Sequence, residues 1–95
     1  MKLPVPVSFE WDEGNLEKSW FKHKVHFKEA EEIFLDVNFK IYPDLNHSEI
    51  EKRFVALGST KHGRKLIAFF TIRENKIRVI SVRDQSRIER NKNEK

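Results

Sequence analysis

The stretch from Lys65 to Arg83 constrains the fold of this chain more than any other. It holds two runs of β-branched and aromatic residues on either side of Glu74-Asn75, which predicts two strands joined by a short turn. Under strict alternation, one face of the second strand carries Arg78, Ile80 and Val82, and the other carries Ile77, Val79, Ser81 and Arg83. Apolar residues on both faces predict a central strand covered on both sides. We therefore expect Arg83, at the end of this strand, to lie at the edge of a cleft.

The size and composition of the chain predict one small domain, residues 1–95, with a tail at 91–95 that frays. With 38% hydrophobic and 36% charged residues, the core must be small and the surface densely charged. The absence of cysteine excludes disulfides and thiolate metal sites. The longest apolar run, Leu66 to Phe70, is far shorter than the roughly 20 residues that span a bilayer. We therefore expect a cytoplasmic protein without a membrane partner.

The net charge of +4 is unevenly distributed along the chain. Residues 1–36 carry a net charge of −3, residues 37–72 carry +3, and residues 73–95 carry +4. A basic carboxyl-terminal half suits a polyanionic partner, with nucleic acid first among the candidates. The alternative is a basic face that is merely solvated, and charge alone does not decide between them.

The amino-terminal half predicts one short strand followed by two helices. Alternation of apolar and polar residues predicts the strand at 9–12. The first helix is expected from Leu16 to about Lys24, with Asn15 as its N-cap and Trp20 buried. Apolar residues at helical spacing predict the second helix from Phe27 to Leu35.

The remaining segments complete an α+β fold. Residues 43–46 have the composition of a turn, and Arg53–Thr60 reads as a strand. Gly63 supplies the positive φ of the turn that follows, and Asp84 or Ser86 caps a final helix. We predict a small antiparallel β-sheet meander with two amino-terminal helices and a carboxyl-terminal helix, all packed on one face.

Few residues outside the arginines suggest chemistry. The chain has no phosphate-binding glycine loop, dinucleotide-binding glycine pattern, nucleophile elbow or His-Glu-x-x-His motif. His23 and His26 lack a well-placed third ligand, so we expect no metal site and no cofactor. Trp11 and Trp20 could stack on nucleic-acid bases, but their spacing favours packing in the core.

A set of short motifs in a fixed order gives the sequence a family resemblance. The motifs are Phe9-Glu10-Trp11-Asp12, Asn15-x-x-Lys18 leading to Lys22-His23, Val25-His26-Phe27-Lys28-Glu29-Ala30, Ile33-Phe34, His47-Ser48-Glu49-Ile50-Glu51-Lys52-Arg53-Phe54, Leu57-Gly58-Ser59-Thr60, Gly63-Arg64, Ile77–Arg83 and Glu89-Arg90. In these motifs the chain resembles the BrnT toxins of type II toxin–antitoxin modules, which have a RelE-like ribonuclease fold. The chain has Lys24 where the family usually has glycine, Val82 where it has alanine, and no tyrosine after Arg90.

The resemblance implies a ribonuclease of the mRNA interferase type that inhibits translation. The ribose 2′-OH would attack its own phosphodiester, so neither a metal nor an external nucleophile is needed. The catalytic residues implied are His23, Glu51, Arg64 and Arg83, with Glu51 or His23 as the base and the two arginines as phosphate clamps. The RNA-binding residues implied are Lys22, Arg53, Arg73 and Arg78.

The resemblance also implies a cognate antitoxin. This partner would be a small DNA-binding, BrnA-like protein that covers the basic cleft in a hetero-oligomer and represses the shared operon. Two alternatives stay open: a non-catalytic RNA-binding module, and an inactive toxin homologue retained for binding the antitoxin.

Overall fold

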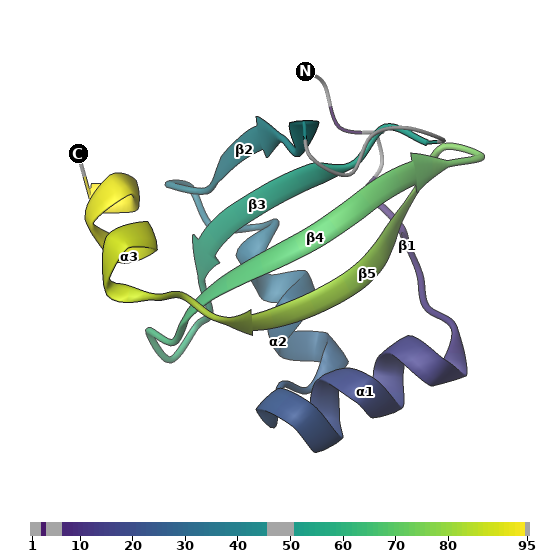
Figure 1. Cartoon of the computed structure of the whole chain (residues 1–95), viewed down its shortest axis with the longest axis horizontal. Helices are drawn as coiled ribbons and strands as arrows, with labels where there is room; N and C mark the ends of the chain where they lie inside the picture. The colour runs from purple at the N-terminus through teal and green to yellow at the C-terminus, as the bar shows by residue number, and fades with distance from the viewer. Residues whose placement is uncertain (1–2, 4–6, 46–50, 95) are drawn as a thin grey trace.

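Five strands form one mixed sheet in the order β1-β5-β4-β3-β2, and three helices pack around it (Figure 1). The computed structural model describes Leu3 and residues 7–45 and 51–94. The elements are β1 Phe9–Glu10, α1 Glu13–His23, α2 Phe27–Ile33, β2 Lys40–Pro43, β3 Phe54–Ser59, β4 Lys65–Arg73, β5 Lys76–Asp84 and α3 Arg87–Glu94. The predicted α+β class is therefore confirmed.

The hairpin of β4 and β5 is the centre of the sheet, as predicted. Glu74 and Asn75 both have positive φ, at 50° and 64°, which gives the turn the twist that suits a two-residue hairpin. The prediction of strict alternation along β5 is wrong, however. Phe69 pairs with Ser81 and Phe70 pairs with Val79, so β5 has one extra residue at this point.

This β-bulge changes which side chains of β5 share a face. An extra residue in one strand shifts the alternation beyond it by one position. Ile77, Val79 and Val82 consequently all point into the core, and each is 0% exposed. Arg83 leaves the strand on the opposite face and turns its guanidinium toward Phe69.

The two edges of the sheet depart from the predicted antiparallel meander. The strand at 9–12 is present but shorter, and β1 pairs in parallel with β5, only at Ile77 and Arg78. Strand β2 occupies the other edge and pairs antiparallel with β3, where the sequence predicted no strand. Ile41 and Tyr42 are residue types that favour strands, and pairing with β3 keeps this short segment extended.

Helix α1 begins one turn earlier than predicted because Asp12, and not Asn15, is its N-cap. The Asp12 Oδ1 accepts the backbone N–H of Asn15 at 2.7 Å. The helix ends at Lys24, which has the left-handed conformation (φ 55°, ψ 39°) that a glycine normally adopts. The predicted burial of Trp20 is wrong: this side chain is 47% exposed, and Ser19 faces the sheet instead.

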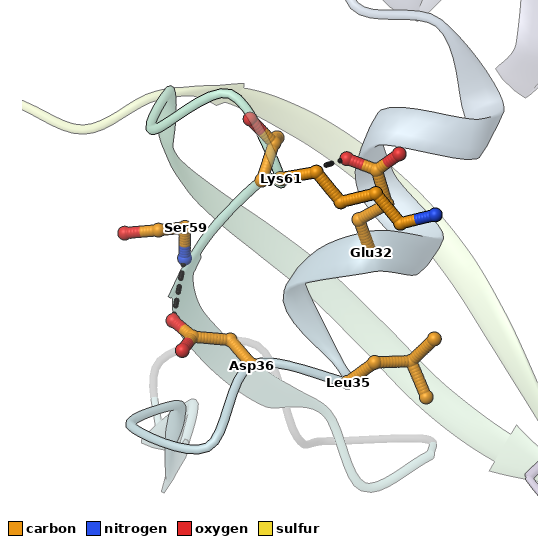
Figure 2. A pocket seen from close by; sticks show the side chains of 6 residues that line it. Glu32, Leu35, Asp36, Ser59 and Lys61 are labelled. Carbon is orange, nitrogen blue, oxygen red and sulfur yellow. Dashed lines mark hydrogen bonds between the residues drawn. The ribbon is translucent and has the colours of Figure 1, made fainter.

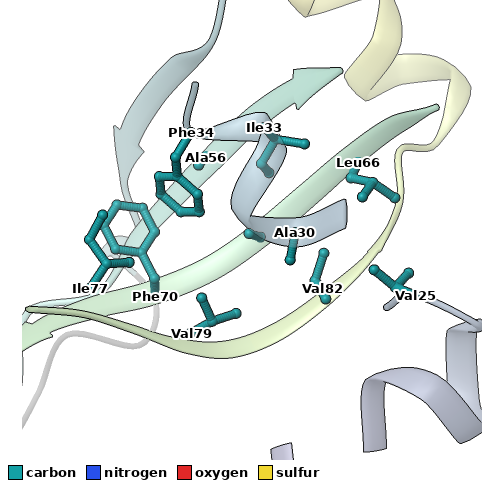
Figure 3. Close-up of a cluster of buried hydrophobic side chains, with 11 residues drawn as sticks. Val25, Ala30, Ile33, Phe34, Ala56, Leu66, Phe70, Ile77, Val79 and Val82 are labelled. Carbon is teal, nitrogen blue, oxygen red and sulfur yellow. The ribbon is translucent and has the colours of Figure 1, made fainter. Parts of the chain in front are cut away.

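Helix α2 packs closely on β3 and closes the core (Figure 3). Gly58 allows this approach, because a Cβ at that position would lie 2.7 Å from the carbonyl oxygen of Ile33. The buried cluster comprises Val25, Ala30, Ile33, Phe34, Ala56, Leu66, Ala68, Phe70, Ile77, Val79 and Val82. Its members come from α2, from the α1–α2 junction and from the three central strands, which explains why the hairpin determines the rest of the fold.

Helix α3 lies at one end of the sheet, apart from α1 and α2 (Figure 1). Ser86 caps it: its hydroxyl accepts the N–H of Glu89 at 3.2 Å, and the Glu89 carboxylate accepts the N–H of Ser86 at 2.8 Å. The helix includes residues 91–94, part of the segment for which the sequence predicts fraying. Among the described residues, no helix has both the length and the apolar character needed to cross a membrane.

Candidate functional site

The predicted site residues separate into two groups at opposite ends of β5. Arg83 pairs with Ile67 in the sheet, and Ile67 lies six residues before Arg73 in β4. At about 3.3 Å per residue, the backbones of Arg73 and Arg83 are roughly 20 Å apart. Glu51 is hydrogen-bonded to Arg73 and therefore belongs to the far end. One RNA phosphate cannot contact Glu51 and Arg83 together in this conformation.

The first group surrounds the turn between β4 and β5. Glu51 accepts two hydrogen bonds from Arg73, at 3.1 and 3.0 Å, and this pairing lowers the pKa of Glu51. Arg78 donates to Glu10 at 2.7 Å and to Asp12 at 2.9 Å, and so ties β1 and the start of α1 to β5. The charge of Arg53 also acts on Glu51. Carboxylates thus balance much of the positive charge at this end.

The second group, which we call the junction cluster, consists of His23, Arg64, Arg83, Asp84 and Glu89. These residues lie around the end of β5. Arg64 connects Asp84 to the end of α1, whereas Arg83 leaves β5 on the opposite face of the sheet and contacts Glu89 of α3. Three of the four predicted catalytic residues are in this cluster, and Lys22 is exposed on the last turn of α1 beside it.

Arg64 is the most highly bonded member of the junction cluster. Its Nε and Nη2 donate to the two carboxylate oxygens of Asp84 at 2.7 and 3.1 Å. Nη1 donates to the carbonyl of Lys24 at 2.8 Å and reaches Glu29 at 3.3 Å, and Nη2 also donates to the carbonyl of His23 at 3.0 Å. All five N–H groups of the guanidinium therefore have partners. A phosphate could bind Arg64 only by displacing one of these acceptors.

These contacts have two consequences for the cluster. The two carbonyls belong to the end of α1, where cationic donors stabilise the partial negative charge of a helix. Arg64 thus fixes the position of His23 through the backbone. The hydrogen bond from Arg64 is also the main cause that lowers the pKa of Asp84, and the nearby charge of His23 acts in the same direction.

Arg83 is held by helix α3. Its Nη1 and Nη2 donate in parallel to the two carboxylate oxygens of Glu89, at 2.8 and 2.9 Å. This fork lowers the pKa of Glu89 from 4.5 to about 2. Nη1 also donates to the carbonyl of Asp84 at 3.1 Å, and the guanidinium carbon lies 5.8 Å from the Phe69 ring centroid. The Nε–H of Arg83 has no partner among the described residues.

Sequence reasoning missed the acidic half of this cluster. Asp84 was considered only as a helix cap, and Glu89 only as part of a motif. The signal for Glu89 was available, because Ser86 and Glu89 have the spacing of a capping box, which directs the glutamate back toward the end of β5. Asp84 could not have been found this way, because its partner Arg64 is twenty residues distant and depends on strand register.

His26 and a pocket beside α2 lie outside the junction cluster. His26 is the N-cap of α2 and accepts the N–H of Lys28 at 3.2 Å, whereas His47 lies outside the described residues. Within the described ranges, no three His, Cys, Asp or Glu side chains gather as a metal site would require. A pocket of about 260 Å³ beside α2 is lined by Glu32, Leu35, Asp36, Ser59, Thr60 and Lys61 (Figure 2).

The lining of this pocket makes it a poor place for RNA. Glu32 accepts the backbone N–H of Lys61 at 3.0 Å, and Asp36 accepts that of Ser59 at 2.8 Å (Figure 2). Both carboxylates therefore serve to fasten α2 to the loop that follows β3. A polyanion would meet their negative charge.

Comparison with known proteins identifies the family. The model of the BrnT ribonuclease toxins of type II toxin–antitoxin systems matches residues 11–89. The chain belongs to the BrnT family. The crystal structure of the Brucella abortus ribonuclease toxin BrnT is similar to it, with a TM-score of 0.65 and 21% sequence identity over 85% of this chain and 99% of that one. No curated protein sequence matches the chain.

Membership in the BrnT family confirms the resemblance and the toxin class predicted from the motifs. A type II toxin implies an antitoxin partner. At Lys24, where the family usually has glycine, the backbone has the left-handed conformation although the residue is not glycine.

Proposed function

We propose that this BrnT-family chain cleaves RNA at the junction cluster without a metal ion, and that it inhibits translation by cutting mRNA in the cytoplasm. The observation that carries the proposal is the arrangement of Arg83. Glu89 fixes its guanidinium in one orientation and leaves the Nε–H without a described partner. A guanidinium held in this way is preorganised to bind a second pair of oxygens, such as those of a phosphate.

The two arginines of the cluster then take distinct roles. Arg83 would stabilise the charge that develops on the phosphorane. Because its five donors already have partners, we assign Arg64 the role of positioning the end of α1 rather than of binding phosphate.

Lys22 and the arginines of the first group, around the turn between β4 and β5, are assigned to RNA binding. Lys22 lies beside the junction cluster, and Arg53, Arg73 and Arg78 lie toward the turn of the hairpin, so a strand of RNA along β5 would pass both groups. Glu51 would hold Arg73 in place rather than act as the base, because it lies too far from Arg83. The antitoxin that covers this path would be BrnA-like and would form a hetero-oligomer with the toxin.

The proposal is tested by incubating the purified protein with RNA in the presence and absence of EDTA. We expect cleavage to be unaffected by EDTA and the products to carry a 2′,3′-cyclic phosphate or a 3′-phosphate. A substrate with a 2′-deoxyribose at the cleavage position should not be cut. Loss of activity with EDTA and recovery with zinc or magnesium would overturn the metal-independent mechanism.

Two variants connect the activity to the cluster. Arg83→Lys keeps the charge but loses the planar fork, and the loss of one such donor costs about 3 kcal/mol, or roughly a hundredfold in rate. His23→Gln should lose activity to a similar or greater degree. Arg87→Lys, on the exposed first residue of α3, is the matched control and should cleave normally.

The pairing of Arg83 with Glu89 favours a second candidate function. If the negative charge of Glu89 keeps Arg83 from stabilising the phosphorane, the protein would bind RNA without cutting it. Binding by the wild-type protein with no cleavage under any condition would support that alternative and reject the ribonuclease proposal for this chain.

A further inference from the structure

Two large aromatic side chains of α1, Trp20 and Phe21, are exposed, and for Trp20 the sequence pattern predicts burial. Trp20 is 47% exposed and Phe21 is 71% exposed, whereas the small Ser19 between them and Lys18 is only 4% exposed. The chain therefore orients α1 so that a serine faces the sheet and two aromatic rings face solvent. Leaving such rings in water forgoes roughly 2 kcal/mol of burial for each, so their exposure calls for a binding explanation.

The segment around these rings is basic without interruption. Residues 18–28 contain four lysines, two histidines and no acidic residue. Lys18, Lys22, Lys24 and Lys28 are all exposed. Glu17, three residues before Trp20 and four before Phe21, is the one acidic neighbour of the rings on α1. Exposed aromatic rings within a run of lysines are the combination that binds single-stranded nucleic acid, since every base offers a face for stacking.

The backbone conformation of Lys24 also supports nucleic-acid binding by this segment. Its left-handed conformation, with φ at 55°, costs a non-glycine residue about 1 kcal/mol. In return, the ammonium group of Lys24 lies over the Trp20 ring, 5.4 Å from its centroid. A glycine at this position would remove both the strain and the cation beside the ring.

The aromatic rings also lie next to the junction cluster. Arg64 donates to the carbonyls of His23 and Lys24, so the last turn of α1 is bonded directly to that cluster. Trp20 and Phe21 precede His23 by less than one helical turn, which is about 5 Å along the helix axis. A nucleotide beside the one held at the cluster would therefore reach the exposed face of α1.

We propose that Trp20 and Phe21 form a stacking platform for unpaired RNA bases next to the cleaved phosphate, and that Lys18, Lys22 and Lys24 contact the adjoining phosphates. This inference rests on the proposed ribonuclease function, to which it adds a preference for single-stranded substrate. The proposed occupant is RNA because residues 18–28 carry four lysines and no acidic residue, which suits a polyanion, and the rings offer faces for base stacking. The antitoxin remains the other occupant that the experiment must distinguish.

The test uses a short single-stranded RNA oligonucleotide with 2′-O-methyl riboses, which binds but cannot be cut. Trp20→Ala and Phe21→Ala should each weaken its binding by about 10-fold to 100-fold, the range found for loss of one stacked base. Binding of an RNA duplex should change little. In a Trp11→Phe background, where Trp20 is the remaining tryptophan, the single-stranded oligonucleotide should quench the fluorescence.

Leu35→Ala is the matched control, because Leu35 is 69% exposed and apolar but lies on the far side of α2 beside the acidic pocket. It should bind the oligonucleotide normally, and all variants should keep the melting temperature of the wild type to within a few degrees. Undiminished binding of single-stranded RNA by both Trp20→Ala and Phe21→Ala would overturn the platform. The same result together with weaker binding of the antitoxin would assign this surface to the protein partner.

The outcomes separate this inference from the proposed function. If the platform variants lose RNA binding but the wild-type protein cuts no RNA, the platform stands and the ribonuclease proposal fails. If cleavage depends on Arg83 but the platform variants bind and cut like the wild type, the ribonuclease proposal stands and the platform fails.

Discussion

Substitution of Arg64 distinguishes a structural role from a catalytic one. Family resemblance assigns Arg64 to the phosphate, but the structure surrounds its guanidinium with acceptors from Asp84, Glu29 and the end of α1. We therefore expect Arg64→Ala and Arg64→Lys to lower stability. The rate of cleavage per folded molecule should fall by much less than the roughly hundredfold expected for loss of a phosphate clamp.

The size of the effect follows from the individual contacts. The ion pair with Asp84 contributes no more than about 1 kcal/mol, because the Asp84 side chain is 60% exposed and solvent screens it. The 3.3 Å contact with Glu29 adds a few tenths of a kcal/mol at most. The two hydrogen bonds to the carbonyls of His23 and Lys24 contribute about 1 kcal/mol each. Loss of all contacts in Arg64→Ala thus costs roughly 2–3 kcal/mol.

For a domain of this length, 1 kcal/mol corresponds to about 4–8 °C in melting temperature. The melting temperature of Arg64→Ala should therefore be roughly 10–20 °C below that of the wild type. Arg64→Lys keeps the charge and some of the bonds, so its melting temperature should fall by about half that amount. Thermal unfolding followed by circular dichroism measures this. Cleavage rates should be compared at a temperature where each variant is folded, with Arg87→Ala as the exposed control.

The two roles give opposite results. A phosphate clamp would lose roughly a hundredfold in cleavage rate with little change in melting temperature. That outcome for Arg64→Lys would refute the structural role and return Arg64 to the catalytic residues.

Three further predictions test other parts of the fold. Gly58→Ala should lower the stability of the fold by about 1–3 kcal/mol, seen as a lower melting temperature, because its Cβ would lie 2.7 Å from a carbonyl oxygen of α2. In the control Gly14→Ala, the nearest neighbour of the new Cβ is at 3.4 Å, so stability should not fall. Equal losses of stability in the two variants would contradict this prediction. Lys24→Gly should raise stability by about 0.5–1 kcal/mol by removing strain at φ 55° while weakening the binding of single-stranded RNA; a lower melting temperature would count against it. Pairing with Arg83 lowers the pKa of Glu89 from 4.5 to about 2, so the ion pair stabilises the fold above pH 4.5 and this stabilisation is lost as the pH falls toward 2. Between pH 4.5 and 2, the melting temperature of Glu89→Gln should therefore fall less than that of the wild type. Identical pH profiles for the two proteins would show that this ion pair does not stabilise the fold.

Local patterns in the sequence predicted the elements near the hairpin well. The turn at Glu74-Asn75, the positive φ of Gly63 and the final helix are all present. Each depends on a few neighbouring residues whose conformational preferences act in the same direction. The BrnT-family motifs added the fold class, because their order along the chain is specific even though each motif is short.

The errors occurred where a residue's environment depends on distant segments. Trp20 has a helical spacing that predicts burial, but the orientation of α1 against β5 leaves it exposed. Strand β2 was not predicted; only its last residue, Pro43, belongs to the predicted turn at 43–46, and the strand pairs with the distant β3. The N-cap was displaced to Asp12 because the same carboxylate also binds Arg78 of β5.

The sequence by itself determined that this chain folds around the β4–β5 hairpin, that its carboxyl-terminal half is basic, and that it belongs with the BrnT toxins. Only the tertiary structure decided which candidate residues meet. A single extra residue in β5 places Arg83 on the face opposite Ile77 and Val79, and strand register brings Arg64 to Asp84 while leaving Glu51 roughly 20 Å from Arg83. Alternation and propensity are local properties, whereas a β-bulge and the pairing of charges across strands are fixed by the packing of the whole domain.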